Sequence, residues 1–146
     1  MNRTAMIRAM QVAAVAMLAF VAPSALAQKS KASIPWVSSL AKAKKTAAKQ
    51  NKPMMVDFSA EWCPPCKAMK ASTWKDGQVI ERAKRFVPVL IDIDKQRKAT
   101  DDAKVTAVPT IVFYTSKGKE ILRAEGYRDV KGILDLMAEA EKKARS

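Results

Sequence analysis

The sequence predicts a single α/β domain built on a central mixed sheet of about four strands, with helices on both faces. Three observations support this class. Short apolar runs at 54–59, 87–93 and 110–114 have the length and the two-sided hydrophobicity of interior strands. Segments with helical periodicity alternate with the first two runs and close the chain. This order is typical of a sheet whose early strands pair in parallel and whose last two form an antiparallel hairpin.

Residues 1–27 are expected to be a secretory signal rather than part of the fold. Arg3 and Arg8 precede an apolar stretch, and Ala25-Leu26-Ala27 matches the small-x-small pattern of signal peptidase cleavage. The alternative is a membrane anchor, but the apolar stretch is short for a span and no second span follows it. We therefore expect the domain to occupy 28–146, with no stable membrane insertion after cleavage.

The composition excludes several classes of function. The formal charge of +13 falls to +11 when Arg3 and Arg8 leave with the signal. The basic residues are scattered and lack interleaved aromatic residues, which favours a solvated surface over a nucleic-acid site. The sequence contains no histidine, which excludes Cys-His catalysis and ordinary histidine-rich metal sites.

The first helix is predicted from Pro35 to about Gln50. Ser33 and Pro35 are placed like an N-cap and a first-turn proline, and apolar residues then recur at helical spacing between lysines. The strand 54–59 follows. Because it is apolar on both faces, Asp57 in its middle is expected to be buried.

The second helix is predicted to begin at Pro64 and Pro65, since prolines in a first turn remove no helical hydrogen bond. It runs toward Trp74, and Asp76-Gly77 separates it from a further helical stretch that ends near Phe86. The strand 87–93 comes next.

The last third of the chain is predicted to hold a hairpin and a terminal helix. A short helical turn is expected at 101–104, followed by the strand 110–114 and a tight turn into 120–126. Asp129 caps the final helix. Its apolar stripe consists of Val130, Ile133, Leu134 and Met137.

The chain's two cysteines, Cys63 and Cys66, lie three positions apart where the strand 54–59 meets a helix. That spacing places them on one face of a helical turn, close enough to form a disulfide. The alternative is a purely structural disulfide, but so short a ring removes little conformational entropy from the unfolded chain and would stabilise the fold only weakly. We therefore interpret the pair as redox-active. The methionines fit apolar faces and are interpreted as core residues rather than copper ligands: Met54, Met55, Met69 and Met137.

Together these segments resemble the thioredoxin family. The active-site run of that family is reproduced from Val56 to Lys67, including Ala60-Glu61-Trp62-Cys63 and Pro65-Cys66-Lys67. Val108-Pro109-Thr110 falls at its cis-proline loop, and Gly126 falls near the end of its last strand. The resemblance covers about 33–140 and implies the thioredoxin fold, with a cis peptide bond before Pro109.

Three positions depart from ordinary thioredoxins. Pro64-Pro65 stands where they have Gly-Pro, Ser59 replaces a tryptophan, and Leu90 occupies the place of a lysine beside the buried acid. The run that begins Cys66-Lys67-Ala68-Met69 is more similar to exported thioredoxin-like domains. These include the C-terminal domain of the bacterial transmembrane disulfide reductase.

The expected catalytic residues are Cys63, Cys66 and Asp57. Cys63 is expected to be the nucleophile, at an edge that stays partly open, because the helix N-terminus favours its thiolate. Cys66, one turn deeper, is expected to resolve the mixed disulfide. Asp57 is expected to have a raised pKa and to accept the proton of Cys66, through a water as the resemblance implies. The alternative role for Asp57 is purely structural.

The residues expected to contact substrate flank this pair. The resemblance places Trp62 beside the reactive sulfur and leaves the Val108 backbone free to pair with an extended substrate segment, because Pro109 offers no N–H. The first turn of the helix completes the expected surface with Pro64 and Pro65.

The sequence therefore predicts a periplasmic thiol-disulfide oxidoreductase that exchanges with exported proteins, more as a reductant or electron relay than as an oxidant. We expect a monomer without cofactor or metal, with a membrane disulfide reductase as electron donor. Two alternatives stay open. One is a metal-handling module that holds Cu(I) or Zn on two thiolates, and the other is a non-catalytic thioredoxin-like interaction domain.

Overall fold

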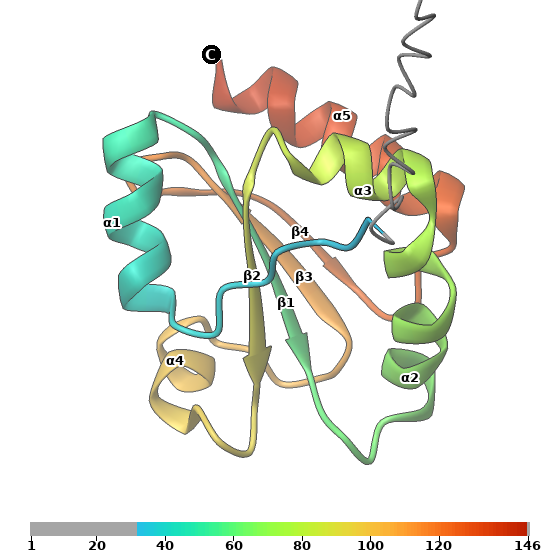
Figure 1. Ribbon diagram of the computed structural model, residues 1–146. Coiled ribbons are helices and arrows are strands. Elements are labelled where there is room, and N and C mark those ends of the chain that lie inside the picture. The colour runs from blue at the N-terminus through green and yellow to red at the C-terminus, as the bar shows by residue number, and fades with distance from the viewer. Residues whose placement is uncertain (1–31, 146) are drawn as a thin grey trace, which may run out of the picture.

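The computed structural model describes residues 32–145, which form a four-stranded mixed sheet between two layers of helices (Figure 1). The strands are β1 (Met54–Ser59), β2 (Val87–Asp92), β3 (Thr110–Tyr114) and β4 (Glu120–Glu125), in the spatial order β2-β1-β3-β4. β1 pairs in parallel with β2 and antiparallel with β3, and β3 pairs antiparallel with β4. The predicted class and mixed sheet are confirmed, while the predicted signal at 1–27 lies outside the described residues.

The two faces of β1 supply two hydrophobic cores. Met54, Val56 and Phe58 pack with residues of α1 and the region of α4, whereas Met55 packs with residues of α2, α3 and α5. This division follows from the alternation of side chains along a strand. Figure 1 shows the same two layers. The helices are α1 (Leu40–Gln50), α2 (Pro64–Ala71), α3 (Gly77–Ala83), α4 (Arg97–Asp102) and α5 (Val130–Ala144), with a 3₁₀ turn η1 (Thr73–Lys75).

The predicted start of the first helix is wrong. α1 begins at Leu40, and its N-cap is Ser39, whose hydroxyl accepts a hydrogen bond from the Lys42 N–H at 3.3 Å. The preceding segment is extended instead. Val37 forms a parallel bridge with Val89 on the outer edge of β2, so pairing with the sheet outweighs the local helix signal.

Two other helices differ from prediction: α4 spans Arg97–Asp102 where the sequence predicts a turn at 101–104, and α2 ends at Ala71, before the 3₁₀ turn that holds Trp74. The predicted break at Asp76 and the predicted cap at Asp129 are observed. Asp76 caps α3 by accepting hydrogen bonds from the N–H groups of Gln78 and Val79. Asp129 caps α5 through the Gly132 N–H at 2.7 Å.

In the predicted stripe of α5, Ile133 and Met137 are buried in the core, and Val130 and Leu134 are partly buried and pack against it. The four methionines interpreted as core residues are all buried. Within 32–145, no helix is long and apolar enough to cross a membrane.

A short loop before β3 is fixed by hydrogen bonds from both sides. The Thr110 hydroxyl donates to the Ala107 carbonyl at 2.7 Å, and the Gly126 N–H donates to the Pro109 carbonyl at 2.8 Å. Gly126 has φ +83°, a left-handed conformation that favours glycine. The residue after β4 therefore fixes this loop at one end of the sheet. The C-terminal end of β1 lies at the same end.

Candidate redox site

Asp57 lies in the middle of β1 with only 4% of its surface exposed. Its neighbours across the sheet are apolar, Leu90 on β2 and Ile111 on β3. Oδ1 of Asp57 has no hydrogen-bond partner among the described residues. Burial raises the pKa of Asp57 from 3.8 to about 7, and a hydrogen bond from the Trp74 side chain lowers it by a smaller amount. The predicted buried acid is confirmed.

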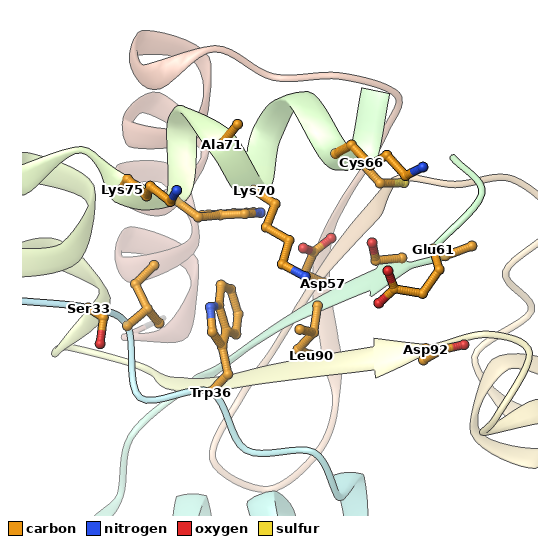
Figure 2. Close-up of a pocket in the computed structure, with 15 residues that line it drawn as sticks. Ser33, Trp36, Asp57, Glu61, Cys66, Lys70, Ala71, Lys75, Leu90 and Asp92 are labelled. Carbon is orange, nitrogen blue, oxygen red and sulfur yellow. The ribbon is translucent and has the colours of Figure 1, made fainter. Parts of the chain in front are cut away.

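A cavity of about 470 Å³ lies beside Asp57, between β1, β2, α2 and the segment before α1 (Figure 2). Trp36 and Trp74 form part of its wall, with their ring centroids 5.2 Å apart and their planes at 82°. Cys66 also lines the cavity. The buried acid and one of the two cysteines therefore border the same space.

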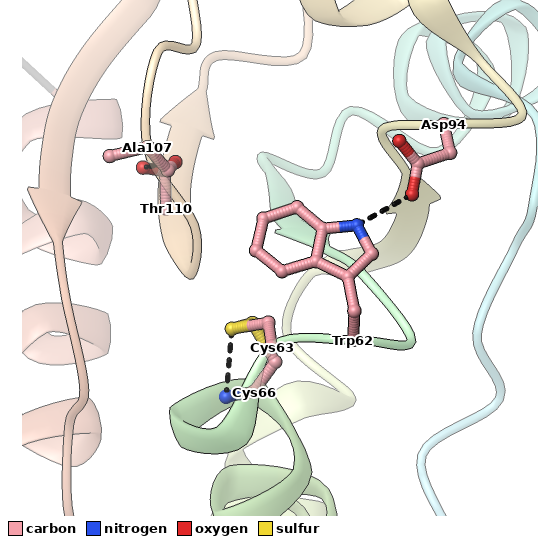
Figure 3. Close-up of a disulfide and its surroundings, with 6 residues drawn as sticks. All are labelled: Trp62, Cys63, Cys66, Asp94, Ala107 and Thr110. Carbon is pink, nitrogen blue, oxygen red and sulfur yellow. Dashed lines mark hydrogen bonds between the residues drawn. A yellow bond between two sulfur atoms is a disulfide. The ribbon is translucent and has the colours of Figure 1, made fainter.

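Cys63 and Cys66 form a disulfide, with their Cα atoms 5.3 Å apart (Figure 3). Cys63 is the N-cap of α2, and its Sγ accepts a hydrogen bond from the Cys66 N–H at 3.2 Å. Pro64 and Pro65 occupy the first two helical positions and are exposed. The cysteines thus lie at the predicted junction of strand and helix. The N-terminus of α2, whose first N–H groups have no partner within the helix, is directed at Cys63.

The exposure expected for Cys63 is not observed in the disulfide form. Cys63 is 2% exposed and Cys66 5%, so the extent of burial does not distinguish the two residues. The cause is packing, because the disulfide holds Cys63 against the first turn of α2, in a cluster against which Val108 and Ile93 also pack. The two cysteines differ instead in their surroundings, because Cys66 lines the cavity beside Asp57 and Cys63 does not.

The Trp62 side chain lies on the surface, with 62% of the residue exposed. Its indole N–H donates to a carboxylate oxygen of Asp94 at 2.9 Å (Figure 3). The hydrogen bond holds the ring beside the disulfide, on the surface of the protein. Trp62 is therefore a surface residue and not part of the core.

The peptide bond between Val108 and Pro109 is cis, as the resemblance implies. Pro109 is buried, whereas Val108 is half-buried and packs against the cluster that contains both cysteines. The loop and the disulfide are thus neighbours, although they lie more than forty positions apart in the chain.

Three residues of this region were not predicted from the sequence as part of the site. Asp94 accepts a hydrogen bond from Trp62, Trp74 lowers the pKa of Asp57, and Lys70 lines the cavity. Only Lys70 had a usable sequence signal, because it follows Cys66 by four positions on a helix. In the range 32–145, no group of three or more His, Cys, Asp or Glu residues is arranged to hold a metal ion.

Comparison with known proteins identifies the family. The sequence profile of the thioredoxin-like domain matches residues 40–141. The chain is 26% identical over 112 residues to the thiol:disulfide interchange protein DsbD of Campylobacter jejuni strain RM1221, covering 74% of this chain and 20% of that protein. It is also 28% identical over 89 residues to a thioredoxin of Chlamydia trachomatis serovar D, covering 58% of this chain and 79% of that protein. This chain therefore spans about a fifth of the length of DsbD.

The fold agrees with the profile. A thioredoxin from Thermus thermophilus superposes with a TM-score of 0.69 at 25% identity, covering 77% of this chain and 90% of that structure. Because the profile match spans most of the chain and the sheet has the same architecture, the chain belongs to the thioredoxin family, and its Cys63–Cys66 pair makes it a thiol-disulfide oxidoreductase.

Proposed function

We propose that this protein is exported by cleavage after Ala27 and works in the periplasm as a monomeric reductant or electron relay. Its partners are exported proteins with disulfides, and its electrons come from a membrane disulfide reductase. The similarity to DsbD, a thiol:disulfide interchange protein, supports this setting. The observation that carries the proposal is the asymmetry around the disulfide: the exposed Trp62 lies beside it at the surface, whereas the cavity that holds Asp57 borders Cys66.

This asymmetry supports a two-step exchange. The Cys63 thiolate attacks a partner disulfide, one partner sulfur leaves as a thiolate, and a mixed disulfide forms. Cys66 then transfers its thiol proton to Asp57 and attacks Cys63. The second partner sulfur leaves as a thiolate, so the partner gains two electrons and the protein ends as the Cys63–Cys66 disulfide. With a pKa of about 7, roughly half of Asp57 is available as the base at neutral pH.

The residues between the cysteines favour the reducing direction. Pro64 and Pro65 carry no charge and no side-chain donor, so neither can stabilise the Cys63 thiolate as a cation would. A less stabilised thiolate makes the dithiol a better reductant. We expect equilibrium titration against glutathione to give a potential of about −230 to −270 mV.

That titration should be read by a fluorescence or mass shift that separates the dithiol from the disulfide. The Cys63→Ser/Cys66→Ser double variant serves as the control and should show no transition. A potential near about −120 mV, which is typical of a strong oxidant, would contradict the reducing role.

The surface proposed to bind substrate comprises Trp62, Pro64, Pro65, Val108 and Pro109. Its anchor is the hydrogen bond from the Trp62 indole to Asp94. We expect Asp94→Ala to release the ring and to raise KM for a protein disulfide by about three- to tenfold, because a bond to a charged group is lost. The rate with a small aromatic disulfide should hardly change.

The matched control for this prediction is Asp101→Ala, which removes an exposed carboxylate at the end of α4. If both variants raised KM equally, the increase would be caused by the lost negative charge and not by release of the Trp62 ring.

A further inference from the structure

The buried acid of this protein has no cation beside it within the sheet. The residue paired with Asp57 on β2 is Leu90, and the residue paired on β3 is Ile111. Oδ1 of Asp57 has no partner among residues 32–145. Any positive charge that stabilises the carboxylate must therefore act from the other walls of the cavity.

Three lysines line that cavity: Lys67, Lys70 and Lys75. All three are exposed, and within the described chain none of their ammonium groups makes a hydrogen bond or ion pair with another residue. Their ammonium groups are therefore free to orient toward a charge inside the cavity. Long lysine stems suit this arrangement, since the stem packs on apolar surface while the charged end moves.

The geometry selects Lys70 from the three. It follows Cys66 by four positions on α2, so the two side chains lie on the same face of the helix. Figure 2 shows the Lys70 side chain directed across the cavity toward Asp57. Figure 2 shows Lys75 farther from Asp57 than Lys70 is. Lys67 is one position from Cys66 on α2, so helical geometry places its side chain on a different face.

Apart from Asp57 and the three lysines, the charged residues that line the cavity are Glu61 and Asp92. Both are acidic, so neither supplies a positive charge to Asp57. Asp92, at the end of β2, forms an ion pair with Lys95 at 2.9 Å. Glu61 is exposed in the turn between β1 and α2. The remaining lining from the segment before α1 consists of Ser33, Ile34 and Trp36, which carry no charge.

We propose that Lys70 is a positioning residue for the resolving step: from α2 its ammonium group stabilises the Asp57 carboxylate, and then the Cys66 thiolate, across the cavity. This inference rests on the proposed function. During the step a proton passes from Cys66 to Asp57, the Cys63–Cys66 bond forms, and the bond from Cys63 to the partner breaks. The negative charge moves from Asp57 to Cys66 and finally to the partner sulfur, while Lys70 keeps its proton throughout.

The first test does not depend on catalysis. The carboxyl group of Asp57 is titrated by ¹³C NMR in the oxidised protein, in wild type and in Lys70→Gln, Lys70→Arg and Lys75→Gln variants. We expect Lys70→Gln to raise the midpoint by about half to one pH unit, because an opposite charge near a carboxylate lowers its pKa. Lys70→Arg should restore the wild-type midpoint, and Lys75→Gln, with the same loss of net charge, should leave it unchanged.

The second test follows the release of a preformed mixed disulfide on Cys63. At pH 7 we expect Lys70→Gln to slow release about two- to fivefold, because a pKa raised by about half to one unit from about 7 leaves only about a quarter to a tenth of Asp57 ionised, where the wild type has about half. The difference should vanish at pH 9. Equal midpoints in all four proteins, or equal shifts in Lys70→Gln and Lys75→Gln, would overturn the role of Lys70. Failure of the wild type to reduce any disulfide would instead overturn the proposed function.

Discussion

A Cys66→Ala variant is expected to accumulate mixed disulfides with its partners and to lose catalysed turnover. Cys63 remains at the N-terminus of α2, where it can attack a partner disulfide, but the residue that releases the product is gone. Cys63→Ala should capture few partners or none. Both variants, expressed in the periplasm, are compared on non-reducing gels after trapping of free thiols.

The two variants are matched controls for each other, since each removes one thiol from the same helical turn. Proteins captured by Cys66→Ala alone would identify the substrates. Equal capture by both variants, or capture by neither, would contradict the division into an attacking and a resolving cysteine.

Asp57→Asn is expected to stabilise the folded protein by about 2 to 4 kcal/mol at pH 8. Burial raises the folded-state pKa of Asp57 to about 7, whereas in the unfolded chain it stays near 3.8. Between these values the unfolded state releases the proton and the folded state keeps it, so the stability of the wild type falls as pH rises through this window. Asparagine has similar size and no charge to bury. Its advantage should disappear as pH falls toward 4.

The same substitution should slow the second step of the exchange at least about tenfold at pH 7, because the base for Cys66 is lost. Denaturant unfolding at several pH values measures the first effect, and release of a mixed disulfide measures the second. Asp101→Asn, on the exposed surface of α4, should change neither. A variant that is both less stable at pH 8 and unaffected in rate would show that Asp57 is a structural acid.

The strands and the redox pair were predictable because their signals are local. β1 and β3 coincide with apolar runs in the sequence, and the prolines after Cys63 fix the start of α2. Burial of Asp57 followed from the apolar residues on both sides of it. These features depend on neighbours within a few positions, which sequence patterns represent well.

The segment before α1 was mispredicted because its conformation is set by distant residues. Ser33 and Pro35 have the chemistry of a helix start, but Trp36 packs edge-on against Trp74 and Val37 pairs with β2. The cavity could not be predicted for the same reason. Its walls come from four parts of the chain, and whether Lys70 or Lys75 lies near the acid depends on how these parts meet in space.

The segment before α1 lies outside the part of the chain that the family profile matches, yet it borders the buried acid. The profile of the family begins at residue 40, yet Ile34 and Trp36, which precede it, form part of the wall around the buried acid. Substitutions in this segment can therefore change the polarity around Asp57 without altering the four strands of the sheet. The surroundings of the acid and the position of the cysteines therefore depend on different parts of the chain, since Cys63 and Cys66 are held by the first turn of α2.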